Sequence, residues 1–110
     1  KKDWETNTLI NLMSDIPLGE GTYKHQAAWT CIDQILVTKN LHPNYSTSIE
    51  VVDGVANIYA AKFLLIPDNK FLGMKLYRTY IGPKYQGGFS DHLPIYIDIQ
   101  KTNDNNIKDK

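Results

Sequence analysis

The feature that most constrains the fold is the alternation near the end of the chain, where residues 95–100 read Ile-Tyr-Ile-Asp-Ile-Gln. Successive side chains of a β-strand point to opposite faces, so this alternation predicts a strand with one buried and one polar face. Extended segments are also expected at residues 31–38 and 49–66, the second interrupted by a turn at Asp53 and Gly54. We therefore expect a mainly antiparallel sheet.

One or two helices are expected beside these strands. Leu9, Leu12 and Met13 recur at helical spacing, which predicts a helix over residues 4–14 that ends before Pro17. At the other end, residues 101–110 are polar with a single apolar residue, and we expect a frayed tail there.

Charge and composition exclude several classes of protein. Twelve Lys and Arg residues balance twelve Asp and Glu residues in a chain of 110, and Arg78 is the only arginine. This balance argues against a long nucleic-acid footprint or a surface built for anionic membranes. The longest uncharged apolar run, residues 63–67, is far shorter than the ~20 residues of a membrane span. Cys31 is the only cysteine, which excludes an internal disulfide and a cysteine-cluster zinc site.

The segment Ser90-Asp91-His92 carries the first chemical signal. It follows Gly87 and Gly88 and directly precedes the predicted last strand. Neighbouring residues of an extended chain point to opposite sides, so Asp91 and His92 are expected to serve different partners around one small space. Glycine, serine and aspartate are also common turn residues, and a purely structural turn is the alternative interpretation.

Asp33 carries the second signal. If residues 31–38 form a strand, the Asp33 carboxylate lies on one face with Ile35 and Val37. A carboxylate in an apolar row needs a partner because its desolvation is costly. We predict that His92 is this partner, since a carboxylate on one ring nitrogen fixes the imidazole tautomer. The alternative is that this face of the strand is solvated.

In order and spacing, these residues resemble the C-terminal half of the endonuclease/exonuclease/phosphatase superfamily. The resemblance rests on the pattern "GTY … W … IDxI … SDHxP", which residues 21–95 match in full. The stretch 71–88 resembles that of bacterial members. The resemblance implies half of a two-sheet, four-layer α/β sandwich, with mainly antiparallel strands and one or two helices. Residues 1–100 would be the C-terminal half of the domain.

The same resemblance implies metal-dependent hydrolysis of a phosphoester. Asp33 would orient and charge-stabilise His92, and His92 would contact the scissile phosphate or assist the attacking water. Asp91 would ligate a Mg²⁺ (or Mn²⁺) ion or lie beside it. A divalent ion of this kind suits phosphate chemistry because it neutralises developing negative charge.

Three further residues are candidates for substrate binding. Trp29 can stack on a substrate group or pack at a strand entrance. Arg78 can approach a phosphate or belong to a packed aromatic loop. Tyr23, from the Gly-Thr-Tyr motif, is the third.

The sequence also departs from the family pattern. The Asn, the metal-binding Glu and the "GDxN" motif of the family's N-terminal half do not occur. We therefore expect these 110 residues to be inactive alone. Metal binding and activity are expected only together with the missing N-terminal half of the same domain, which is the expected partner. The substrate class stays open among nucleic acid, phospholipid or phosphoinositide head group, and sugar phosphate. The alternative from another class is a non-catalytic binding module.

Overall fold

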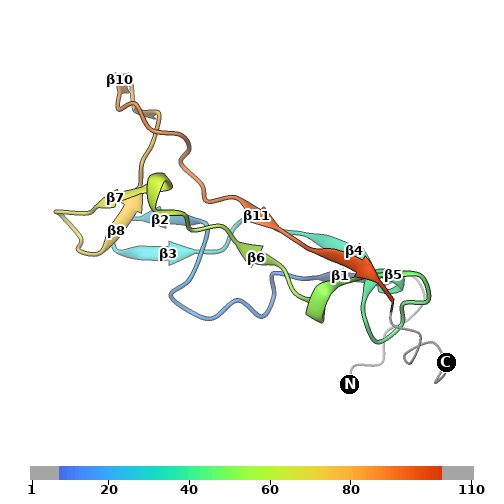
Figure 1. Ribbon diagram of the computed structural model, residues 1–110. Coiled ribbons are helices and arrows are strands. Elements are labelled where there is room, and N and C mark those ends of the chain that lie inside the picture. The colour runs from blue at the N-terminus through green and yellow to red at the C-terminus, as the bar shows by residue number, and fades with distance from the viewer. Residues whose placement is uncertain (1–7, 103–110) are drawn as a thin grey trace. The chain divides into compact units, whose positions relative to one another are not determined.

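Short strands joined by turns and irregular chain make up the computed structural model, which describes residues 8–102 (Figure 1). Two compact units are present, one from residues 8–15, 34–57 and 96–102 and the other from residues 16–33 and 58–95. The strands are β1 (Leu9–Asn11), β2 (Tyr23–His25), β3 (Ala28–Thr30), β4 (Leu36–Thr38), β5 (Ile49–Val51), β6 (Asn57–Ile58), β7 (Leu65–Pro67), β8 (Met74–Leu76), β9 (Tyr80–Ile81), β10 (Lys84–Tyr85), β11 (Ile95–Tyr96) and β12 (Ile99–Lys101).

The expected α/β sandwich with helices is wrong. In residues 8–102 the helical segments are three-residue 3-10 helices, at Lys39–Leu41, Val52–Gly54 and Lys62–Leu64. Where a helix was predicted, residues 9–11 form β1, which pairs antiparallel with β4. Leu9 is 59% exposed while Leu12 and Met13 are buried, so the three do not share one apolar helical face. Residues 4–7 of the predicted helix lie outside the described residues.

The predicted last strand is divided. It consists of β11 and β12, separated by residues 97 and 98. β12 pairs antiparallel with β5, and Ile99 is 54% exposed. Ile95 and Ile97 are half-buried while Tyr96 and Asp98 are exposed, so the predicted alternation is present over residues 95–98. It ends at Ile99, because the two-stranded ribbon provides no second layer to cover that side chain. Residue 101 still belongs to β12, and the predicted tail beyond residue 102 lies outside the described residues.

The predicted interruption at Asp53 and Gly54 is present, but it does not form a hairpin. Both residues adopt positive φ, 59° and 64°, within a 3-10 helix. The strand before this turn, β5, pairs with the distant β12.

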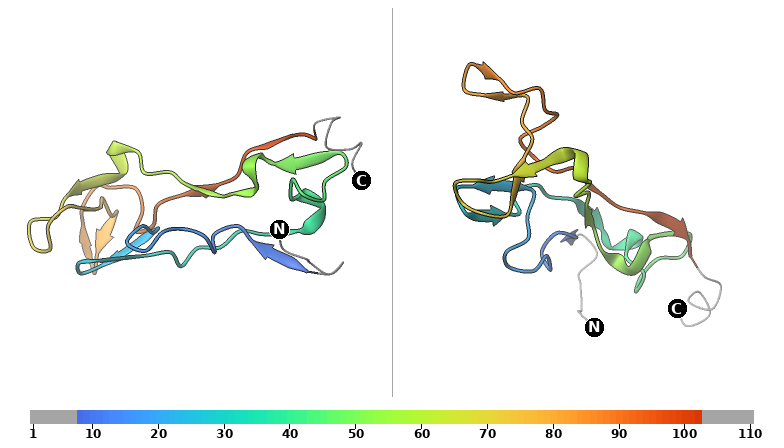
Figure 2. Two further views of the ribbon diagram at one scale, coloured as in Figure 1. Left: turned by 90° about the horizontal axis from the view of Figure 1, so that it is seen from below. Right: turned by 60° about the vertical axis from the view of Figure 1, so that its left-hand side comes forward.

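The second unit contains the hairpins β2–β3, β7–β8 and β9–β10. The β2 strand lies beside β8, and Figures 1 and 2 show the β2–β3 and β7–β8 hairpins side by side. Lys24 of β2 fixes this arrangement, because its ammonium donates to the Asp68 carboxylate at 2.8 Å and to the carbonyls of Leu72 and Met74 at 2.9 Å each. An ammonium has three donor hydrogens, so Lys24 is fully used.

A small apolar core supports the same unit. Leu64, Leu76 and Leu93 are each at most 6% exposed, and Trp29 packs against them. Leu93 follows His92 directly, so this core anchors the chain next to the predicted imidazole. Among residues 8–102, none of the helices has the length and apolar composition that crossing a membrane requires.

Candidate active site

The structure brings His92 and Asp33 together. The His92 Nδ1 atom lies 2.8 Å from Asp33 Oδ2, although 59 residues separate the two in sequence. The side chains are 33% and 34% exposed, so the pair is partly buried but open to a ligand. The predicted contact between these two residues is confirmed. Their predicted catalytic role stays a prediction.

The local structure around Asp33 differs from the prediction. Residues 31–35 form irregular chain between β3 and β4, and only residues 36–38 of the predicted strand are extended. The apolar strand row that motivated a buried carboxylate is therefore absent. Asp33 is held instead by hydrogen bonds, one of them from a residue that was not among the predicted site residues.

That residue is Thr22, whose hydroxyl donates to the Asp33 carboxylate. Thr22 is fully buried, and its backbone is fixed on both sides: its N–H donates to the Thr30 carbonyl at 2.9 Å, and its carbonyl accepts from Leu93 N–H at 2.8 Å. Gly21 permits this approach, because a Cβ there would lie 2.4 Å from the Thr30 carbonyl. This role of Thr22 could have been suspected from the sequence, because its hydroxyl lies inside the Gly-Thr-Tyr motif.

These contacts set the charge of Asp33. Partial burial raises the pKa of this carboxyl, but the hydrogen bonds from Thr22 and His92, together with the charge of His92, outweigh burial and bring the pKa below its usual 3.8. Asp33 is therefore a carboxylate near neutral pH and can only accept hydrogen bonds. It follows that His92 Nδ1 carries a proton, which leaves Nε2 as the ring nitrogen for a ligand or water.

The loop that carries His92 is held by close backbone packing. Gly88 N–H donates to the Arg78 carbonyl at 3.0 Å, and a Cβ on Gly88 would lie 2.0 Å from the Tyr77 carbonyl oxygen. Only glycine fits there. Beyond it, His92 N–H donates to Ser90 Oγ at 3.1 Å, which closes a tight turn. The segment is thus a structural turn that also presents the imidazole.

Asp91 does not form a complete metal site with the described residues. Its side chain is exposed. Residues 8–102 contain no group of three His, Cys, Asp or Glu side chains that could hold a metal ion. Mg²⁺ requires near-octahedral oxygen coordination, so a single carboxylate does not fit it. The predicted role of Asp91 as one ligand stays a prediction.

Of the predicted substrate-binding residues, Tyr23 contacts His92 and Arg78 contacts Tyr23. The Tyr23 ring centroid lies 5.1 Å from that of His92, at an interplanar angle of 45°. On the Tyr23 ring, the Arg78 guanidinium carbon lies 5.4 Å from the centroid. Tyr23 thus contacts both the imidazole and the guanidinium.

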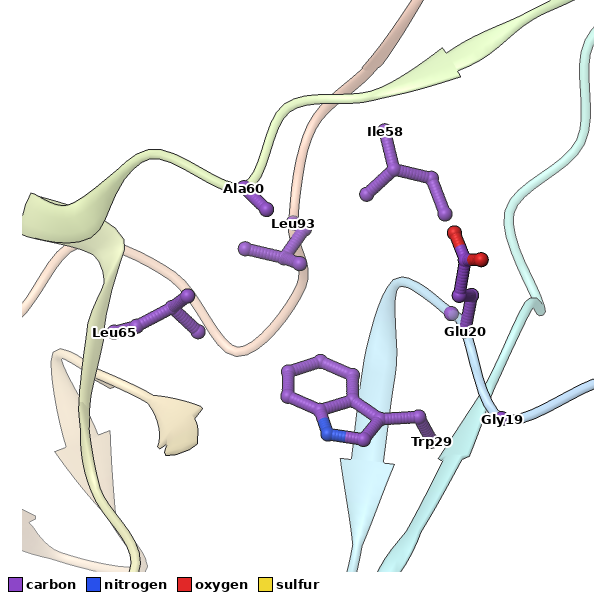
Figure 3. Close-up of a pocket in the computed structure, with 8 residues that line it drawn as sticks. Gly19, Glu20, Trp29, Ile58, Ala60, Leu65 and Leu93 are labelled. Carbon is purple, nitrogen blue, oxygen red and sulfur yellow. The ribbon is translucent and has the colours of Figure 1, made fainter. Parts of the chain in front are cut away.

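Trp29 lies in a different environment. It lines an open apolar hollow of about 240 Å³, and Figure 3 shows its indole facing Leu65 and Leu93. Since Trp29 also packs against the core, packing at a strand entrance describes its position well. Its predicted substrate contact remains untested.

Comparison with known proteins gives one match. A sequence model described as "Endonuclease/Exonuclease/phosphatase family" matches residues 1–101, nearly the whole chain. Neither the curated proteins nor the solved structures give a significant match.

Proposed function

Because this chain belongs to the endonuclease/exonuclease/phosphatase family, we propose that it carries the histidine–carboxylate part of a site that hydrolyses a phosphoester. The observation that carries the proposal is the 2.8 Å contact between His92 Nδ1 and Asp33 Oδ2. A His–carboxylate pair at a partly open surface is the arrangement that a proton-transferring or phosphate-contacting imidazole needs.

The proposed chemistry follows from the fixed tautomer. With Nδ1 hydrogen-bonded to Asp33, a neutral His92 offers the Nε2 lone pair to an attacking water. When protonated, the same nitrogen donates to a phosphate oxygen, and the Asp33 carboxylate stabilises the positive imidazolium. Thr22 is a positioning residue in this scheme, because it acts through Asp33.

The family is generally dependent on a divalent metal, and we extend that dependence to this protein. In this proposal Asp91 contributes one oxygen ligand for Mg²⁺ or Mn²⁺, and residues outside 8–102 contribute the others. The 110 residues alone are then expected to lack activity, and residues 1–100 act as the C-terminal half of a larger domain.

The test is hydrolysis of a bis-aryl phosphodiester by the full-length protein, measured with Mg²⁺ and with a chelator in its place. We expect turnover that requires the metal, and none from the 110 residues alone. Absence of metal-dependent turnover by a folded full-length protein would favour a binding module instead. Turnover by the 110 residues alone would refute the half-site proposal.

A further inference from the structure

A second hollow lies in the same unit as the candidate site and differs from the first in its charge. It encloses about 180 Å³, and its lining includes Lys24, Lys70, Lys75, Arg78 and Asp68. Four cationic side chains against one carboxylate leave an excess of three positive charges, in a chain whose net charge is zero. The hollow is therefore a local concentration of positive charge.

The lining residues divide into two groups. Lys24 and Asp68 are committed to each other: both side chains are 5% exposed, their charges cancel, and the Lys24 donors are all used. Lys70, Lys75 and Arg78 take part in neither of the two ion pairs found within residues 8–102. Lys70 and Arg78 lie over the Phe71 and Tyr23 rings, each 5.4 Å from the ring centroid, and these contacts do not neutralise their charge. The hollow is therefore suited to an anion.

The walls of the hollow are well held. Lys75 belongs to β8, where it pairs with Ile66 of β7, and it is partly buried. Arg78 is partly buried, and its backbone accepts the hydrogen bond from Gly88. Backbone pairing therefore fixes the positions from which the Lys75 and Arg78 side chains extend toward the hollow.

Arg78 connects this hollow to the imidazole. It lines the hollow, its guanidinium lies over the Tyr23 ring at 5.4 Å, and that ring lies 5.1 Å from the ring of His92. The lining of the hollow includes neither His92 nor Asp33, so a ligand that fills the hollow occupies a different place from a group held at His92.

From this arrangement we infer that the hollow lined by Lys70, Lys75 and Arg78 binds a phosphate group other than the one cleaved at His92. The inference rests on the proposed function, and it names the substrate class: a small molecule that carries at least two phosphate groups. A guanidinium and two ammonium groups are suited to a phosphate dianion, since charge-assisted hydrogen bonds to phosphate are among the strongest. The neutral charge of the chain favours a small ligand over a long nucleic acid.

Binding is tested first without any reliance on activity. Inorganic phosphate is titrated into the 110-residue chain at constant ionic strength, and the amide signals are followed by NMR. We expect saturable shifts centred on residues 70–78. The affinity for phosphate should be about tenfold weaker in Lys75→Gln and in Lys70→Gln. It should not change in Lys62→Gln, because Lys62 is an exposed lysine of the same unit that does not line the hollow. His92→Ala should retain these shifts, which separates this inference from the proposed function.

Three results would overturn the inference: no saturable shift, shifts confined to residues 90–92, or equal losses in Lys75→Gln and Lys62→Gln. The substrate class is tested with the full-length protein. Lys75→Gln should raise KM about tenfold for a doubly phosphorylated sugar and leave KM for a singly phosphorylated one unchanged. The proposed substrate class would be refuted by an equal effect on both substrates. It would also be refuted if an oligonucleotide bound at residues 70–78 more tightly than the doubly phosphorylated sugar. All variants are checked for folding by thermal melting.

Discussion

At the scale of single residues, Asp33 determines what His92 can do. It accepts a hydrogen bond from Thr22 and another from His92, and its lowered pKa keeps it a carboxylate at neutral pH. The contact between Asp33 and His92 was predictable because a carboxylate beside apolar residues needs a partner. The reason was only partly correct, since Asp33 lies in irregular chain and not in a buried strand.

Thr22 provides a test at this scale. Thr22→Val keeps the volume of the side chain and removes the hydroxyl, so we expect the pKa of Asp33 to rise. The free energy of unfolding should fall by about 1 kcal/mol. This loss is modest because a third of the Asp33 side chain is exposed to solvent. NMR titration of the Asp33 carboxyl measures the first effect. Thr22→Ser keeps the hydroxyl, so both the pKa of Asp33 and the free energy of unfolding should stay close to their wild-type values. An unchanged Asp33 titration in Thr22→Val would show that the hydroxyl does not hold the carboxylate.

At the scale of elements, hydrogen bonds between distant segments replace long strands. Residues 86–89 bond to residues 77–79, and Lys24 joins the β2–β3 hairpin to the β7–β8 turn. The two-stranded ribbons were not predictable, because periodicity reports which side chains share a face and not how many strands pair. The basic hollow was missed for a related reason: its cations come from segments that only the fold brings together.

Gly88 provides the test of this close packing. Gly88→Ala places a Cβ against the Tyr77 carbonyl, so the loop must move, and we expect a loss of about 3 kcal/mol in the free energy of unfolding. Gly82→Ala is the matched control: its φ of +56° is unfavourable for alanine, but the space around it is open, and we expect a loss of about 1 kcal/mol. Urea denaturation measures both. Equal losses would mean that the approach to Tyr77 is not a constraint.

The Lys24–Asp68 pair predicts a dependence of stability on pH. The hydrogen bond from Lys24, joined by backbone donors, lowers the pKa of Asp68 from 3.8 to about 2. A lowered pKa in the folded state stabilises the protein above the unfolded value, so this contribution should be complete above about pH 4 and lost as pH falls towards 2. The melting temperature, measured from pH 6 to 2, should fall less steeply in Asp68→Asn than in the wild type. Parallel profiles would contradict this assignment.

At the scale of the whole molecule, the candidate site belongs to one compact unit. Asp33, His92, Thr22, Tyr23 and Arg78 all lie within residues 16–33 and 58–95. The membership of the family covers residues 1–101 and was predictable from ordered motifs, whereas the α/β sandwich inferred from it was not found. Motifs record the residues around a site more faithfully than they record the elements that surround it, because a few backbone contacts are sufficient to position the side chains.

The catalytic role of His92 is tested most directly by comparing His92→Ala with Trp29→Ala in the full-length protein, at saturating phosphodiester and Mg²⁺. His92 acts on charge that develops in the transition state, so its removal should lower kcat about a hundredfold or more. Trp29 offers an apolar surface that is equal in ground and transition states, so its removal should act mainly on KM, with folding checked by thermal melting. A near-normal kcat in His92→Ala would contradict the catalytic role of His92, and its contact with Asp33 would then serve only the fold.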